Sequence, residues 1–208
     1  MAEAQRLTLD ALHRELGARM VDFAGFAMPL QYDGIMAEHA QARARAALFD
    51  VSHMGQVLLR ADAPEAAARA LEALVPQDVL GLRDGRQRYG FFTNDAGGIE
   101  DDLMIARRGD VLFLVVNAAR RAEDEALLRA GLEPAGVTVE TLADRALLAL
   151  QGPRAEAALA TLDPRAAEMR FMETATLNLA GAEAWVSRSG YTGERSEERR
   201  VGKECATG

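Results

Sequence analysis

Apolar and polar residues alternate so as to predict a compact mixture of strands and helices between positions 51 and 142. Period-two alternation is typical of half-buried strands, and apolar residues three and four positions apart are typical of helices. We therefore expect strands at residues 57–59, 88–93, 102–106, 111–116 and 137–142, and helices at residues 62–75 and 117–130. This is the element order of a split βαβ unit with helices on one face of a mostly antiparallel sheet, so the expected fold class is α+β.

Polar and glycine-rich segments predict the ends of these elements. Residues 94–98 (Asn-Asp-Ala-Gly-Gly) and 108–110 (Arg-Gly-Asp) are strong turn signals between expected strands. Residues with short oxygen-bearing side chains precede the expected helices, where they are favoured N-caps. The expected caps are Thr8, Asp33, Asp62 and Asn117.

The flanking segments are expected to pair with each other. Strands at residues 20–23, 146–150, 174–179 and 182–187 and helices at residues 8–16, 35–47 and from 153 onward follow from the same patterns. We therefore expect two domains. The first is discontinuous and comprises residues 1–50 and 143–194; the second comprises residues 51–142.

Composition and charge narrow the classes of function. The chain of 208 residues is 49% hydrophobic and 27% charged, as in a soluble globular protein, and its net charge of −8 argues against nucleic-acid binding. No apolar run approaches the roughly 18 to 20 residues that span a bilayer, and no export signal is visible, so a cytoplasmic location is expected. The single cysteine, Cys205, can form no intrachain disulfide, and no cluster suggests a metal site.

The last fourteen residues differ in composition from the rest. Every basic residue before them is arginine or histidine, whereas the only lysine, Lys203, and the only cysteine lie among them. Residues 195–205 (RSEERRVGKEC) resemble a translated sequencing adapter. We expect residues 195–208 to be a non-native tail; the alternative is a genuine charged terminus, and sequencing the source DNA across codon 195 decides between them.

Two adjacent carboxylates provide the strongest candidate chemistry. Asp101 and Asp102 follow two glycines at the start of an apolar strand, where neighbouring side chains point to opposite faces. One is expected to face solvent. The other would face inward, where burial and a like charge raise a carboxyl pKa. Alternatively, both merely solvate the end of the strand.

Other polar residues are weaker candidates. Ser52 and His53 are neighbours and cannot face each other as a nucleophile and its base, so His53 is expected to be a hydrogen-bonded residue at a junction. His13 and His39 lie on expected helices and are expected at the surface. Tyr191 lies between two glycines, where its ring could stack on a planar heterocycle or simply occupy a turn.

Six ordered segments together resemble the aminomethyltransferase (T-protein) family of the glycine cleavage system. The resemblance covers residues 6–194 and is carried by residues 22–32 (DFAGFAMPLQY), 48–55 (LFDVSHMG), 92–103 (FTNDAGGIEDDL), 115–118 (VVNA), 148–153 (LALQGP) and 190–194 (GYTGE).

The resemblance implies a folate-binding fold with two split-βαβ, ferredoxin-like domains, and it implies a specific reaction. Members of the family take an aminomethyl group from the lipoyl arm of the H-protein, release ammonia and pass the one-carbon unit to tetrahydrofolate. By motif position, Asp102 would be the catalytic carboxylate, Tyr89 and Tyr191 would contact the pterin, and Asn117 would line the folate pocket. Tetrahydrofolate is thus the expected co-substrate and the lipoylated H-protein the expected partner, with no nucleic acid, membrane or metal.

The chain departs from the family after Glu194. Arg195 and Ser196 stand where the family continues toward a glutamate that binds the pterin, and a later arginine and the final barrel domain are also missing. The first domain is therefore expected to be truncated, and the chain is expected to be an inactive N-terminal fragment.

Two related activities remain open at this stage. The folate domain of a sarcosine or dimethylglycine oxidase shares the fold, but such chains usually begin with a flavin domain, for which no room precedes the first motif. A folate-binding accessory protein of iron–sulfur assembly would carry a reactive cysteine, which residues 1–194 lack.

Overall fold

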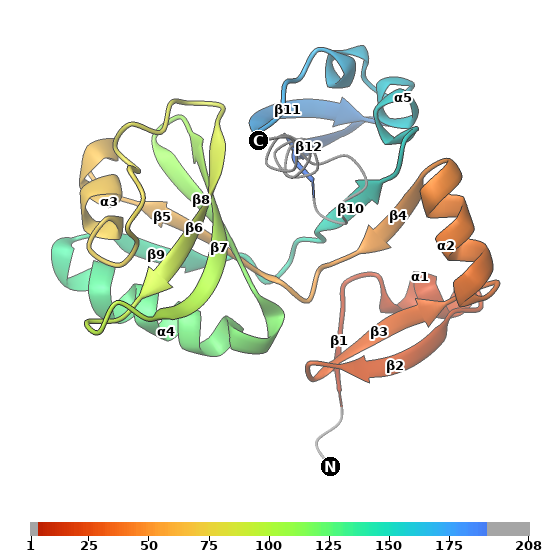
Figure 1. The fold of residues 1–208 in the computed structure, drawn as a ribbon, viewed down its shortest axis with the longest axis horizontal. Helices are drawn as coiled ribbons and strands as arrows, with labels where there is room; N and C mark the ends of the chain where they lie inside the picture. The colour runs from red at the N-terminus through yellow and green to blue at the C-terminus, as the bar shows by residue number, and fades with distance from the viewer. Residues whose placement is uncertain (1–3, 191–208) are drawn as a thin grey trace, which may run out of the picture. The chain divides into compact units, whose positions relative to one another are not determined.

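The computed structural model describes residues 4–190 and divides into two compact units. One unit combines residues up to Ser52 with those from Ala146 onward, and the other is His53–Arg145. Tyr191 and the tail from residue 195 lie outside the described residues. The predicted α+β fold class is confirmed, because each unit combines helices with largely antiparallel sheet (Figure 1).

The continuous unit is built on a five-stranded antiparallel sheet with the order β6-β7-β8-β5-β9. Its strands are β5 Gly55–Arg60, β6 Gln87–Thr93, β7 Ile99–Arg108, β8 Val111–Val116 and β9 Thr138–Thr141. The helical elements are α3 Pro64–Leu71, η1 Ala118–Arg120, α4 Arg121–Leu132 and η2 Glu133–Ala135. This element order is that of the expected split βαβ arrangement.

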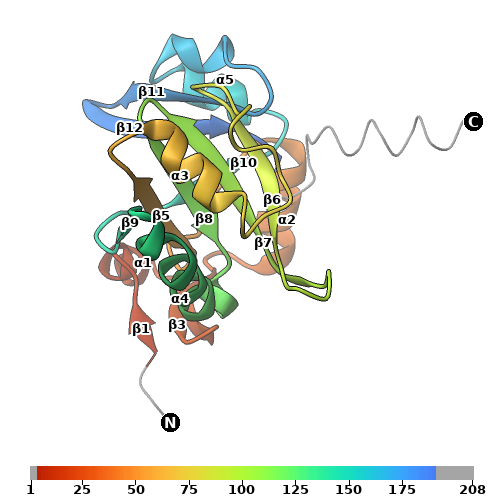
Figure 2. The ribbon, with the colours of Figure 1, turned by 90° about the vertical axis from the view of Figure 1, so that its left-hand side faces the viewer.

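The core of this unit lies between one face of the sheet and its helices. Alternate residues of the strands point to that face and meet the apolar sides of α3 and α4, which both lie in front of the strands in Figure 2. The fully buried members of this core include Val57, Leu59, Leu71, Phe92, Ile105, Leu114, Leu128 and Leu132. Each large side chain buried here contributes roughly 1.5–3 kcal/mol.

The turn between β6 and β7 sets the register of the site. Asn94 Oδ1 accepts hydrogen bonds from the backbone nitrogens of Ala96 and Gly98, at 3.1 and 2.9 Å. Gly97 has φ +77°, which glycine adopts without strain. After this turn, Phe92 pairs with Asp101 and Phe91 pairs with Asp102.

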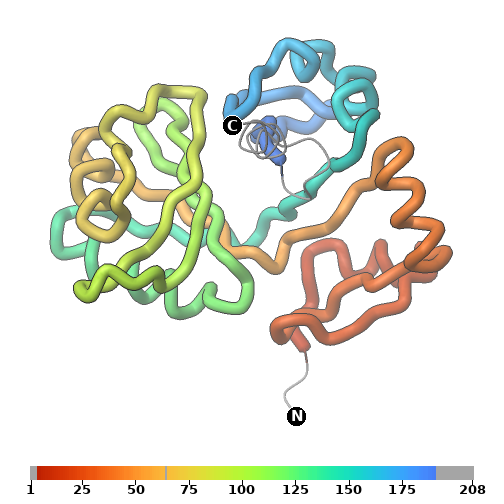
Figure 3. The backbone as a smooth tube through the Cα atoms, viewed as in Figure 1, coloured from red at the N-terminus to blue at the C-terminus, as the bar shows by residue number. Residues whose placement is uncertain are grey.

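The discontinuous unit contains three small sheets among the described residues, with the orders β1-β3-β2, β10-β4 and β11-β12. Its strands are β1 Gln5–Arg6, β2 Arg19–Phe23, β3 Phe26–Gln31, β4 Ala47–Asp50, β10 Leu148–Gln151, β11 Glu173–Leu179 and β12 Ala182–Arg188. Its helical elements are α1 Asp10–Glu15, α2 Ile35–Ala44, α5 Ala155–Ala160 and η3 Pro164–Ala167. β4 and β10 run side by side and join its two chain segments (Figure 3).

The predicted N-caps Thr8, Asp33 and Asp62 are wrong. Helices α1, α2 and α3 begin after Leu9, Gly34 and Ala63, and none of these caps donates or accepts through a side chain. At α2 the backbone nitrogens of Tyr32, Asp33 and Gly34 donate instead to Glu38 Oε1. A carboxylate one turn into the helix therefore binds the chain that leads into it, and these bonds lower the pKa of Glu38.

Candidate functional site

Asp101 and Asp102 lie near the start of β7 and point to opposite faces of the sheet. Asp101 shares the core-facing side with buried Phe92 and Leu103 and is half-buried, whereas Asp102 is exposed on the side away from α3 and α4. The expected division into one outward and one inward carboxylate is therefore what the structure shows. Asp102, the residue matched to the family's catalytic position, is the outward one.

Asn117 connects the two carboxylates. Its Nδ2 donates to Asp102 Oδ1 at 2.7 Å and to Asp101 Oδ1 at 3.0 Å, and it lies 3.2 Å from the backbone oxygen of Asp102. Asn117 stands at the N-cap position of η1, as predicted, but its side chain makes no capping bond and donates to the two carboxylates instead. Strand pairing explains the difference: β8 ends at Val116 opposite Leu103, which brings Asn117 beside the two carboxylates.

Asp124 on α4 completes this group, and sequence reasoning missed it. Its side chain is buried, and desolvation raises its pKa to about 7, helped by a hydrogen bond with Asp101 and by the charge of Asp101. The raised pKa expected for an inward carboxyl is thus found at Asp124. We call Asp101, Asp102, Asn117 and Asp124 the carboxylate cluster.

A pattern in the sequence marks Asp124 in retrospect. Asp124, Leu128 and Leu132 are the buried residues of α4 and are spaced four positions apart, which places them on one side of the helix. An acidic residue on an apolar stripe is rarely buried without a partner. The spacing therefore indicates a buried acid, but only the fold supplies Asp101 as its neighbour.

Tyr89 lies on the same face of the sheet as Asp102. β6 and β7 pair so that Tyr89 is opposite Met104 and Phe91 is opposite Asp102. Tyr89 and Asp102 are therefore diagonal neighbours on adjacent strands. Residues in this relation are about 7–8 Å apart, which is within reach of an aromatic side chain. Both aromatic residues are partly exposed, at 40% and 39%. The face thus combines a carboxylate, held by an amide, with aromatic surface, which suits a planar ligand that carries or develops positive charge.

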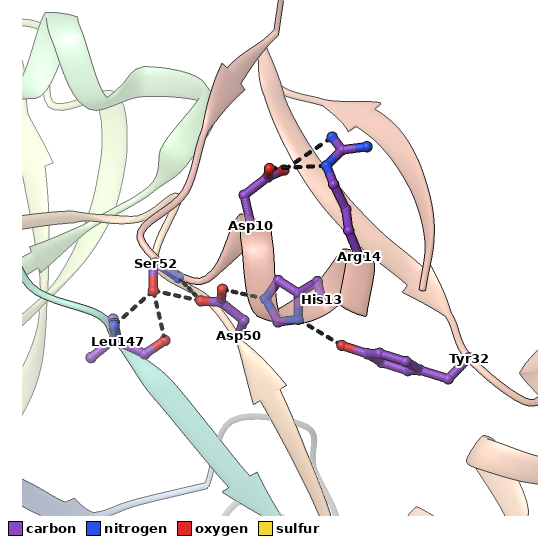
Figure 4. Close-up of polar contacts among 7 residues, drawn as sticks. All are labelled: Asp10, His13, Arg14, Tyr32, Asp50, Ser52 and Leu147. Carbon is purple, nitrogen blue, oxygen red and sulfur yellow. Dashed lines mark hydrogen bonds and ion pairs between the residues drawn. The ribbon is translucent and has the colours of Figure 1, made fainter. Parts of the chain in front are cut away.

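A second polar network occupies the discontinuous unit (Figure 4). His13 Nε2 lies 2.8 Å from Asp50 Oδ2, and His13 Nδ1 lies 2.7 Å from the Tyr32 hydroxyl. The hydroxyl of Ser52 donates to Asp50 Oδ1 at 2.5 Å, and Ser52 Oγ accepts from the nitrogen of Leu147 at 2.9 Å. The expectation that His13 lies at the surface is wrong, because it is buried.

This network holds the unit together rather than providing a nucleophile. Among the described residues, the Ser52 hydroxyl donates to the Asp50 carboxylate and not to an imidazole, so it lacks the serine–histidine pair that commonly activates a serine nucleophile. Its bonds to Asp50 and Leu147 join segments that are 95 residues apart in the chain. His53, its neighbour, is buried.

Two kinds of feature are absent from residues 4–190. Within that range, no group of three or more His, Cys, Asp or Glu is arranged to hold a metal ion. None of the helices described there has the length and apolar character needed to cross a membrane.

Comparison with known proteins identifies the family. A family model described as the GCVT N-terminal domain matches residues 9–206. An aminomethyltransferase of Rubrobacter xylanophilus is 46% identical over 91% of this chain and 51% of its own length. One from Thermus thermophilus is 42% identical over 93% of this chain and 56% of its own length.

A solved structure is also similar. The crystal structure of glycine cleavage system aminomethyltransferase T from Bartonella henselae matches with a TM-score of 0.81 and 36% identity, over 91% of this chain and 51% of that one. The chain thus spans about half the length of the curated relatives it matches. The fold, the matched residues and the level of identity agree, and the chain belongs to the family defined by the GCVT N-terminal domain.

Proposed function

We propose that this chain is part of an aminomethyltransferase that moves a one-carbon unit from an aminomethyl group on a lipoylated H-protein to tetrahydrofolate, with release of ammonia. The relatives named aminomethyltransferase at 46% and 42% identity support the reaction class. The observation that carries the proposal is the exposed Asp102 carboxylate, held by Asn117 on the sheet face that also carries Tyr89.

The reaction balances without a metal or a redox step. The donor loses its C–N and C–S bonds, and its carbon forms new bonds to two nitrogens of tetrahydrofolate. The two protons displaced from those nitrogens end on ammonia and on the lipoyl thiol. Bound tetrahydrofolate would supply the two nucleophilic nitrogens.

The residues of this chain would stabilise charge and orient the folate. As the carbon–nitrogen bond of the donor breaks, the one-carbon unit becomes cationic, and the Asp102 carboxylate would stabilise this charge. Asn117 fixes Asp102 Oδ1 before the substrate arrives, so little reorganisation is needed. Tyr89 would offer its ring to the pterin, and Tyr191, outside the described residues, is proposed for the same site.

The test is tetrahydrofolate-dependent release of ammonia from aminomethylated lipoyl H-protein. It compares the 208-residue chain with a protein continued past Glu194 from the source DNA, since the chain by itself is proposed to be inactive. In the longer protein, Asp102→Asn is expected to lower kcat about 100-fold or more, because it removes the charge and keeps the shape.

A matched control is Asp110→Asn, which removes the same charge from the exposed β7–β8 turn. It is expected to leave kcat within about twofold. Equal losses in the two variants would show that net charge, not the position of Asp102, matters. Absence of tetrahydrofolate-dependent ammonia release from the longer protein would reject the proposed function.

A further inference from the structure

The carboxylate cluster contains more acid groups than donors that can satisfy them. Asn117 Nδ2 supplies hydrogens to one oxygen each of Asp101 and Asp102. The other side-chain oxygen of Asp101 and the Oδ2 of Asp124 are both buried, and no donor among residues 4–190 reaches either. Asp124 shares a side-chain hydrogen bond with Asp101, and two carboxyls can form such a bond only when one of them carries a proton.

From this geometry we propose that Asp124 is a positioning residue: it holds a proton, donates it in a hydrogen bond to Asp101, and through Asp101 and Asn117 sets the direction of the Asp102 carboxylate. The proton on Asp124 and its hydrogen bond to Asp101 do not depend on what the protein catalyses. Its consequence for catalysis rests on the proposed function.

Burial assigns the proton to Asp124 and not to Asp101. Asp124 is 1% exposed on the apolar side of α4, beside Leu128 and Leu132, whereas Asp101 is half-buried and already accepts from Asn117. The neutral form is favoured where solvent is excluded, and the ionised form is favoured where a donor is present. The pKa of about 7 at Asp124 agrees with this assignment.

The charged groups around Asp124 do not remove the need for a proton. Arg120 is the nearby cation and opposes the rise in the Asp124 pKa, but its Nη2 lies 3.5 Å from Glu100 Oε2. Glu123 on the same helix and Asp101 on β7 are both acidic and raise the pKa. Ionisation of Asp124 above about pH 7 would therefore place a third negative charge beside Asp101 and Asp102 and remove the hydrogen bond to Asp101.

This arrangement predicts a signal at Asn117 that does not depend on activity. In the 208-residue chain, the side-chain amide resonances of Asn117, followed by NMR between pH 5 and 9, are expected to shift with a midpoint near 7. Asp124→Asn supplies an amide donor in place of the acid and is expected to abolish that step. Glu123→Gln, a matched loss of charge on an exposed position of the same helix, is expected to keep it.

Three results would overturn the inference. They are a wild-type Asn117 signal without a step near pH 7, a step that persists in Asp124→Asn, and a step that disappears in Glu123→Gln. If circular dichroism shows that Asp124→Asn is unfolded, the carboxyl carbon of Asp124 is titrated in the wild-type chain. A midpoint near 7 supports the inference, and a midpoint near 4 rejects it.

The catalytic consequence is tested in the protein continued past Glu194. Ammonia release by the wild type is expected to decline above about pH 7. Asp124→Asn is expected to retain activity within a few-fold and to lose that decline, whereas Asp124→Ala, which has no donor, is expected to lose about tenfold at all pH values. An unchanged pH profile in Asp124→Asn would refute the catalytic link. Wild-type protein inactive at every pH would instead reject the proposed function and leave the NMR result standing.

Discussion

At the scale of single residues, buried polar side chains in this protein work in connected groups. Asp50 has its side chain 1% exposed and receives hydrogen bonds from His13 on one oxygen and from Ser52 on the other. A carboxylate only accepts, so His13 Nε2 carries the hydrogen between them. Burial, followed by the charge of Asp50, raises the pKa of Tyr32, which keeps its hydroxyl protonated beside His13.

Removing His13 should therefore destabilise the discontinuous unit strongly. We expect His13→Ala to lower the free energy of unfolding by about 3 kcal/mol, because it leaves one oxygen of a buried carboxylate without its donor. Denaturant unfolding followed by the fluorescence of Trp185, the single tryptophan, measures the effect in this unit. His39→Ala, at an exposed position of α2, is the control and should change stability by less than about 0.5 kcal/mol. Equal effects would contradict the role of the network.

At the scale of elements, the start of α2 shows how a residue of a helix binds the chain that leads into it. Three consecutive backbone nitrogens converge on Glu38 Oε1, at 2.7, 2.9 and 3.0 Å. Sequence reasoning chose Asp33 because short acidic residues are favoured N-caps. The sequence was sufficient to predict the start of α2 at Ile35, but which side chain binds the nitrogens just before the helix depends on the path of the chain between β3 and α2.

Glu38→Gln should make this helix start less stable at neutral pH and less sensitive to acid. The pKa of Glu38 is lowered in the folded state, so its contribution is present above the unfolded value of 4.5 and is lost as pH falls below it. We expect Glu38→Gln to cost about 1 kcal/mol at pH 7 and less at pH 3. The measurement is denaturant unfolding of both proteins at the two pH values. A cost that does not change with pH would show that the charge of Glu38 is not involved.

At the scale of the whole chain, segments that are distant in sequence pack tightly against each other within the discontinuous unit. Gly152 has φ +116°, and a Cβ placed there would lie 2.6 Å from the backbone oxygens of both Ala42 and Arg45. The nitrogen of Arg154 donates to the oxygen of Arg45 at 2.8 Å. The segment after β10 can therefore pack against the end of α2 only because position 152 carries no side chain.

A comparison of Gly152→Ala with Gly181→Ala should separate the cost of this close backbone approach from the cost of a positive φ angle alone. Gly181, in the β11–β12 turn, also has positive φ, at +91°, but a Cβ there would meet nothing within 4 Å. We expect Gly181→Ala to cost about 1 kcal/mol through strain alone, and Gly152→Ala about 3 kcal/mol because backbone must also move. Trp185 fluorescence during denaturant unfolding reports both. Equal costs would show that the approach of residues 42–46 is not tight.

The sequence by itself determined the fold class and the family. Alternation of apolar residues placed all five strands and both main helices of the continuous unit, because side-chain periodicity reflects burial directly. Ordered motifs such as residues 92–103 carried the family resemblance that the comparisons confirmed. The opposite orientation of Asp101 and Asp102 also followed from local geometry, since adjacent residues of a strand point to opposite faces.

Only the tertiary structure decided which polar groups meet. Asp124, Asp101 and Asn117 come from α4, β7 and the end of β8, and pairing of β7 with β8 under α4 brings them together. His13 and Asp50 are likewise 37 residues apart, and their burial could not be read from α1 alone. The physical reason is the same in both cases. A pKa or a hydrogen bond depends on distances of a few ångströms between groups that the chain separates, and strand register and helix packing set those distances.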